Sequence, residues 1–136
     1  EKLQREVIDT DEEIVKADGR PIPEIFSTEG EAFFRQEETN AVKDAGKKLS
    51  KIIATGGGAV MKKENRDALR QNGTVIYLKK DLSLLALDGR PLSKDEDAVR
   101  KIYEARKDTY EAFADFTIEV DADAEITAER VLKCIF

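Results

Sequence analysis

Two aspartates separated by one residue, Asp9 and Asp11, follow the first apolar run of the chain. In extended backbone a spacing of two points both side chains to one side, so the two carboxylates are expected to share a site. One carboxylate could hold a metal ion through water while the other orients or deprotonates a hydroxyl group, as in phosphoryl transfer. The structural alternative is that Thr10 or Asp11 caps the helix predicted to follow.

A run of glycines, Gly56 to Gly58, directly follows a predicted strand and precedes a predicted helix. Backbone amides in such a run can face a small polar ligand, because no Cβ stands in the way. A flexible connector is the alternative, although the position at a strand end favours binding. The run does not have the G-x-x-x-x-G-K-[ST] pattern of a phosphate-binding loop.

Arg35 and Glu38 lie three residues apart in a stretch with helical spacing, directly after Phe33 and Phe34. At this spacing the carboxylate can hold the guanidinium in a fixed orientation, which suits an arginine that grips a substrate carboxylate. The alternative is an ordinary surface ion pair beside two core phenylalanines.

Two further arginines occupy segments that are compatible with function. Arg90 lies between Gly89 and Pro91, as expected of a lid that closes over phosphates, although a solvated turn is the alternative. Arg106 belongs to a helical stripe that core packing with one outward arginine explains. The other members of the stripe are Ile102, Tyr103, Tyr110 and Phe113.

Composition excludes several classes of function. The net charge of -6 argues against a nucleic-acid surface, because affinity for phosphate backbones comes from clustered Lys and Arg. The absence of histidine excludes Ser-His-Asp triads and His-ligated zinc. The single cysteine, Cys134, has no partner for an intrachain disulfide, and no membrane span or signal peptide is recognisable, so a cytoplasmic location is expected.

The elements that must position these residues follow from periodicity. Four strands are predicted, at 7–8, 51–55, 74–78 and 116–120. Helices are predicted at 23–45, 62–71, 95–114 and 127–135, the last with Thr127 as N-cap. The alternation predicts an α/β domain with a mainly parallel sheet, in which ligands bind beyond the carboxyl ends of the strands. The irregular stretch 81–97 is the best candidate for a mobile loop.

Taken together and in order, these segments resemble the shikimate kinases, a family of P-loop small-molecule kinases. The resemblance is collinear over nearly the whole chain, and the glycine run together with Phe34-Arg35 and Glu38 is close to diagnostic. It rests on Ile8 to Asp11, Ile22 to Phe26, Glu29 to Glu31 leading to Arg35 and Glu38, Ala54 to Val60, Arg90 to Leu92, and Arg106 with Tyr110.

The resemblance implies a three-layer fold, in which helices flank a parallel sheet, and an ATP- and Mg²⁺-dependent activity. The reaction implied is transfer of the γ-phosphoryl group of ATP to the 3-hydroxyl of shikimate, in aromatic amino acid (chorismate) biosynthesis. By position, Asp11 would be the base or orienter, Asp9 would support Mg²⁺ through water, and Arg90 would reach the nucleotide and the transferring phosphate.

The resemblance also implies a substrate site. Arg35, held by Glu38, and Arg106 would clamp the substrate carboxylate, while the glycine backbone would face the ring. The substrate-binding residues implied are Asp11, Phe26, Phe34, Arg35, Glu38, Gly57, Gly58 and Arg106.

The chain also departs from the family. It starts after the strand and Walker A loop with which the family begins, and that strand would lie between 51–55 and 74–78. We therefore expect residues 1–136 to form a single, N-terminally incomplete domain, with a substrate-binding segment at about 11–60 and a lid at about 82–97, inactive as given. The lid has no arginine between Leu82 and Asp88, which predicts altered nucleotide affinity.

Two other functions remain open from the sequence. One is a degenerate, non-catalytic kinase domain with a role in assembly or regulation. The other is a different small-molecule kinase, such as a gluconate kinase. The sequence also leaves open whether the parent protein is fused to another enzyme of the pathway.

Overall fold

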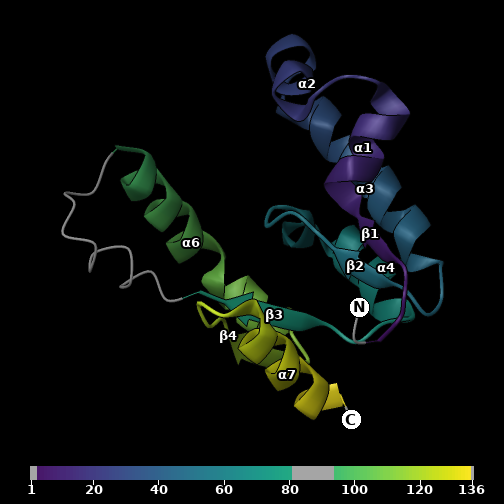
Figure 1. The fold of residues 1–136 in the computed structure, drawn as a ribbon. Coiled ribbons are helices and arrows are strands. Elements are labelled where there is room, and N and C mark those ends of the chain that lie inside the picture. Colours follow the sequence, from purple (N-terminus) through teal and green to yellow (C-terminus); the bar gives the residue numbers. More distant parts are fainter. Residues whose placement is uncertain (1–2, 81–93, 136) are drawn as a thin grey trace. The chain divides into compact units, whose positions relative to one another are not determined.

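The structure, a computed structural model, describes residues 3–80 and 94–135. Contacts divide the chain into two compact units, Glu1–Gly73 and Thr74–Phe136 (Figure 1). Strand and helix alternate in both units, as predicted. The single domain expected over 1–136 stays a prediction.

The first unit contains the parallel strands β1 and β2, with Ile8 opposite Ile53. Helix α3 packs against α1, α2 and α4, and the core forms where Ile14, Ile25 and Phe34 meet. The elements are β1 (Val7–Asp9), α1 (Thr10–Asp18), α2 (Ile22–Glu29), α3 (Glu31–Gly46), β2 (Ile52–Ala54), the 3-10 turn η1 (Ala59–Met61) and α4 (Lys63–Gln71).

The second unit contains the parallel strands β3 and β4, with Tyr77 opposite Thr117. The rings of Tyr77 and Tyr110 lie 5.2 Å apart, so Tyr110 packs α6 against β3. Burial, with a contribution from Tyr103, raises the pKa of Tyr77 to about 12. The elements are β3 (Ile76–Lys79), α6 (Lys94–Phe113), β4 (Phe116–Glu119) and α7 (Ala124–Ile135).

All of the predicted strands are present, with ends that differ from the prediction by one or two residues. β2 and β3 belong to separate two-stranded sheets within the described part of the chain. Among the described residues, no helix is both long enough and apolar enough to cross a membrane.

The helix predicted over 23–45 is in fact two helices, α2 and α3, which meet at Gly30. Gly30 has φ 88° and ψ 174°, a conformation that residues with a Cβ rarely adopt, and its N–H donates to Phe26 O. The glycine therefore ends one helix and begins the next. The apolar periodicity on both sides is helical, which is why it did not reveal the break.

Helix α7 begins earlier than predicted, and Thr127 is not its N-cap. Thr127 lies inside the helix, where its Oγ1 accepts a hydrogen bond from Asp121 N–H at 2.9 Å. The carboxylate of Asp123, which precedes the helix, accepts from Glu125 N–H. An acidic residue in the preceding loop therefore caps this helix.

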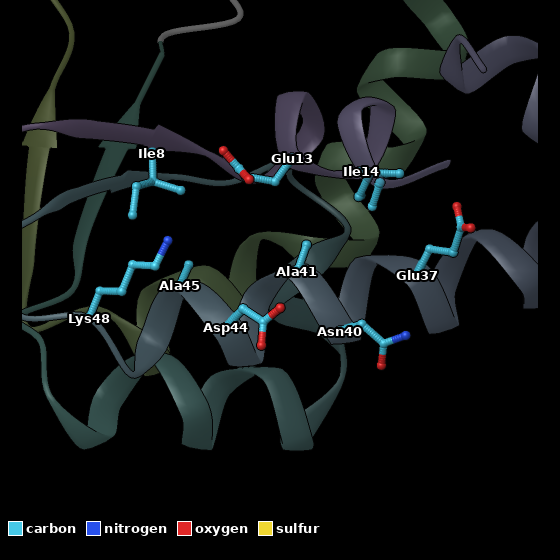
Figure 2. Close-up of a pocket in the computed structure, with 10 residues that line it drawn as sticks. Ile8, Glu13, Ile14, Glu37, Asn40, Ala41, Asp44, Ala45 and Lys48 are labelled. Carbon is cyan, nitrogen blue, oxygen red and sulfur yellow. The ribbon is translucent and has the colours of Figure 1, made fainter. Parts of the chain in front are cut away.

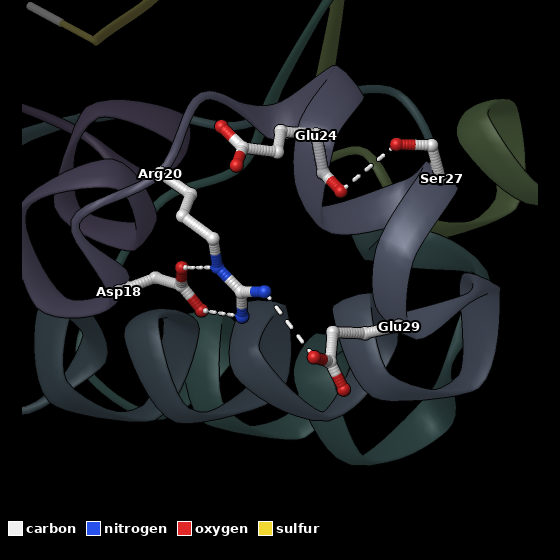
Figure 3. A network of polar contacts seen from close by, with 5 residues as sticks. All are labelled: Asp18, Arg20, Glu24, Ser27 and Glu29. Carbon is white, nitrogen blue, oxygen red and sulfur yellow. Dashed lines mark hydrogen bonds and ion pairs between the residues drawn. The ribbon is translucent and has the colours of Figure 1, made fainter.

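An arginine fixes the connection between α1 and α2 (Figure 3). Arg20 donates from Nε to Asp18 Oδ1 at 2.6 Å and from Nη2 to Oδ2 at 3.0 Å, and its Nη1 donates to Glu29 at 3.2 Å. Gly19, with φ 86°, closes α1 immediately before this arginine. The turn that leads from α1 to α2 is thus held at both ends.

Candidate active site

Asp9 caps helix α1, and Asp11 is the second residue of that helix. Asp9 Oδ1 accepts from Asp11 N–H at 2.9 Å and from Glu12 N–H at 3.3 Å. The prediction that Thr10 or Asp11 would be the cap is therefore wrong. The extended geometry predicted for the pair is wrong too, since the chain has already turned into the helix, but the cap itself brings the two aspartates together.

The carboxylate of Asp11 lies against the glycine run. A Cβ on Gly56 would be 3.4 Å from both of its oxygens. Burial raises the pKa of Asp11, the charge of Asp9 adds to the rise, and the guanidinium of Arg35 opposes it. A raised proton affinity suits a group that must take a proton from a hydroxyl.

Glu38 orients Arg35, as the sequence predicted. Arg35 Nη1 donates to Glu38 Oε1 at 2.9 Å, and the Glu38 side chain is only 3% exposed. On the other side, Arg35 Nε lies 3.5 Å from Oε1 of the exposed Glu31. Burial of the guanidinium acts against its charge, but Glu38 and Glu31 outweigh burial and raise the pKa of Arg35. The guanidinium is therefore a fixed cation.

Gly58 brings the backbone up to this cation. A Cβ on Gly58 would lie 2.5 Å from Arg35 Nη1 and 2.9 Å from Cζ. None of the glycines in the run has a positive φ. Gly58 is therefore required for close approach to Arg35 rather than for an unusual backbone angle.

Two of the predicted aromatic residues also lie together. The rings of Phe26 and Phe34 are 4.5 Å apart at an angle of 31°, and Phe34 is buried while Phe26 is about one-third exposed. Arg35 Cζ lies 5.4 Å from the centroid of the Phe34 ring. Phe34 is thus mainly core, whereas Phe26 retains an apolar surface beside it.

The roles of three further predicted residues stay predictions. Gly57 is exposed between Gly56 and Gly58. Arg106 lies half-buried on α6, in the second unit, so its role in a clamp with Arg35 stays a prediction. Arg90 and most of the expected lid lie outside the described residues.

The described residues include one carboxylate that fits a metal site. Within residues 3–80 and 94–135, no group of three or more Asp, Glu, Cys or His side chains is arranged to hold a metal ion. Asp9 uses Oδ1 for the helix cap, which leaves Oδ2 to accept a hydrogen bond from metal-bound water. This free oxygen fits the support of Mg²⁺ through water that the family resemblance implies for Asp9, and that role stays a prediction.

A separate pocket of about 190 Å³ lies between α1 and α3 (Figure 2). Its lining includes Ile8, Ile14, Glu37, Asn40 and Asp44. None of the predicted site residues lines it. The candidate active site is instead the group formed by Asp11, the glycine run and Arg35.

Sequence reasoning missed two parts of this site. Gly56, which was not among the predicted site residues, lies against Asp11. Asn65 and Arg66, on α4, bond to the turn after the glycines. The glycine run itself pointed to Gly56, whereas no sequence signal distinguishes a buried asparagine near a helix start from a surface one.

The model of one protein family, described as shikimate kinase, matches the chain over residues 1–136. The chain belongs to the shikimate kinase family. A shikimate kinase of Neisseria meningitidis is 39% identical over 98% of this chain and 82% of the relative. One from Synechococcus elongatus is 39% identical over 99% of this chain and 75% of the relative.

Solved structures of shikimate kinases have the same fold. The enzyme from Acinetobacter baumannii in complex with shikimate has a TM-score of 0.84 and 33% identity, covering 96% of this chain and 78% of that one. The enzyme from Aquifex aeolicus has a TM-score of 0.83 and 29% identity, covering 98% and 82%. The predicted family and the P-loop kinase-like α/β fold are confirmed, and neither alternative function is supported.

Proposed function

We propose that the protein uses ATP to phosphorylate the 3-hydroxyl of shikimate, in aromatic amino acid biosynthesis, with its substrate site in the first unit. One observation carries the assignment of the site. The Cβ-free backbone of Gly56 and Gly58 has the Asp11 carboxylate against one glycine and the Arg35 guanidinium against the other. Such an arrangement suits a small ring that bears both hydroxyls and a carboxylate.

Each group has a distinct task. Arg35, oriented by the buried Glu38, binds the substrate carboxylate, and Arg106 of α6 is its proposed second clamp. Asp11 accepts a hydrogen bond from the ring hydroxyl and orients it. The glycine backbone, with Gly57 exposed, faces the ring, and Phe26 covers part of its apolar surface.

In the phosphoryl-transfer step, Asp11 acts as the base. The hydroxyl oxygen of shikimate bonds to the γ-phosphorus of ATP, the bond from that phosphorus to the bridging oxygen breaks, and ADP leaves. The hydroxyl proton passes to Asp11, whose raised pKa favours its uptake. Asp9 is the residue that would hold Mg²⁺ through water, and the ion would supply neutralisation of charge on the phosphates. Arg90 is proposed to reach the transferred phosphate.

The assignment is tested by Asp11→Asn and Arg106→Ala in the full-length protein, with a panel of acceptors that includes shikimate and gluconate. Asp11→Asn is expected to abolish turnover without loss of folding. Arg106→Ala is expected chiefly to raise the KM for shikimate. Unchanged kinetics in both variants, or a preference for gluconate, would refute the assignment.

The remaining proposals concern location and partners. A cytoplasmic location is proposed on the basis of the single cysteine, Cys134, which has no second cysteine in the chain with which to pair. The net charge of -6 favours small anionic ligands held by a few arginines over nucleic acid.

A further inference from the structure

The turn η1 directly follows the glycine run, and helix α4 bonds to it. Asn65, the third residue of α4, is only 1% exposed, and its Nδ2 donates to Ala59 O at 2.8 Å. The next residue, Arg66, donates from Nη1 to Val60 O at 2.9 Å and to Met61 O at 3.0 Å. Three successive backbone carbonyls are therefore bound by two neighbouring side chains.

The turn transmits this restraint to the glycines. Ala59 N–H donates to Gly56 O, and Met61 N–H donates to Gly58 O, both at 3.2 Å. These are the two glycines whose backbone lies against Asp11 and Arg35. Any shift of η1 therefore moves the backbone that faces both charged groups.

The same turn is also tied to the helix that carries Arg35. Lys62, at the end of η1, donates from Nζ to Oγ1 of the buried Thr39 at 3.3 Å. Thr39 follows Glu38 on α3. The turn is thus attached to α4 by two side chains and to α3 by a third.

We infer that Asn65 and Arg66 are positioning residues for the shikimate site, which hold the glycine run at the correct distance from Asp11 and Arg35. The inference rests on the proposed function and extends it to residues that touch no substrate. The reason is geometric, because a backbone used as a binding surface must be fixed by groups behind it.

Helix α4 offers a matched control at its other end. Asn72 donates from Nδ2 to Gly46 O at 3.0 Å, the same kind of bond, but to the end of α3 instead of the glycine turn. If Asn65 served only to dock α4, then Asn65→Ala and Asn72→Ala would both leave the KM for shikimate unchanged, and Asn65→Ala would lower stability more because Asn65 is buried and Asn72 is exposed. If Asn65 positions the glycines, only Asn65→Ala alters the substrate site.

The experiment compares full-length Asn65→Ala, Arg66→Met and Asn72→Ala with the unchanged protein. For Asn65→Ala and Arg66→Met we expect the KM and Kd for shikimate to rise about tenfold, while kcat and the KM for ATP stay within about twofold. For Asn72→Ala we expect lower thermal stability with an unchanged KM for shikimate. Because Arg66 is only half-buried, Arg66→Met is expected to fold, and it can test the inference if Asn65→Ala does not fold.

A second readout requires no substrate. Amide hydrogen exchange over residues 55–61 is expected to quicken in Asn65→Ala and Arg66→Met and to remain unchanged in Asn72→Ala. Equal effects in all three variants, or normal shikimate affinity together with normal exchange in the first two, would overturn the inference. If the unchanged protein neither binds nor phosphorylates shikimate, the proposed function is refuted instead. The exchange data would still decide whether α4 holds the glycine run in place.

Discussion

A Cβ on Gly58 would lie 2.5 Å from Arg35 Nη1 and 2.9 Å from both Cζ and Nη2. The space that a methyl group would need is therefore already taken by the guanidinium. Because Gly58 has φ -78°, alanine would fit its backbone conformation. The glycine is required by its neighbour and not by its own dihedral angles.

Gly58→Ala is accordingly expected to displace the Arg35 guanidinium while leaving the fold intact, since the clash is with the end of a flexible side chain. The affinity for shikimate should fall by about tenfold to a hundredfold, as for a lost charge-assisted bond. Isothermal titration with shikimate measures this. In an Arg35→Ala background, Gly58→Ala should lower the affinity for shikimate almost no further. A further loss of affinity as large as in the unchanged background would show that Gly58 acts independently of Arg35.

The two carboxylates around Arg35 predict an asymmetric result. Glu38 is buried and bonds to Nη1 at 2.9 Å, whereas Glu31 is 71% exposed and lies 3.5 Å from Nε. Glu38→Gln should therefore raise the KM for shikimate several-fold, because a neutral amide holds the guanidinium less firmly. Glu31→Gln is the matched control and should change the KM by less than about twofold. Equal effects in steady-state kinetics would contradict the assignment of Glu38 as the orienting group.

Sequence patterns predicted the strands and the ion pair between Arg35 and Glu38 well, because both depend on local spacing. The substrate-binding roles of the two residues stay predictions. A separation of three on a helix brings a carboxylate to a guanidinium whatever the tertiary structure around it. The cap of α1 was mispredicted, because Asp9, Thr10 and Asp11 are all good capping residues, and the end of β1 decides which one is used. The break at Gly30 was missed for a similar reason, since apolar periodicity continues across it.

The tertiary part of the site could not be predicted from spacing. Asp11, Gly56 and Arg35 are far apart in sequence, and only the pairing of β1 with β2 and the packing of α3 bring them together. The support from Asn65 belongs to the same class, because a buried hydrogen bond to a backbone carbonyl leaves no periodic signal. Such contacts depend on the packing of whole elements.

The paired carboxyl groups of Asp18 and Glu37 predict a pH-dependent stability. Hydrogen bonds from Arg20, aided by Glu37, lower the pKa of Asp18 to about 2. Burial and the nearby Asp18 raise the pKa of Glu37. A raised carboxyl pKa means that the folded state holds the proton more tightly than the unfolded state. The stability therefore falls as the pH rises from the ordinary pKa of a glutamate through the raised pKa of Glu37 in the folded state.

Glu37→Gln removes this titration and is therefore expected to raise the thermal midpoint more at about pH 7 than at about pH 4. Calorimetric scans at the two pH values measure the difference. Glu24→Gln, at an exposed position on α2, makes the same change of charge and should shift the thermal midpoint only slightly at both pH values. A greater gain for Glu37→Gln at the lower pH would reverse the sign and refute the pairing.

Substitution of Gly46, near the end of α3, by alanine would have two opposing effects on stability. Alanine is favoured over glycine within a helix by roughly 1 kcal/mol, so helix propensity alone predicts that Gly46→Ala stabilises the protein. However, the new Cβ would lie 2.6 Å from Ala68 O and 3.1 Å from Ala68 C, which are backbone atoms of α4 and cannot rotate away. Overpacking of this kind costs about 1–3 kcal/mol, so we expect a net loss of stability in chemical denaturation. Lys47→Ala, at the exposed next residue, should be nearly neutral, and a stabilised Gly46→Ala variant would mean that α3 and α4 separate without cost.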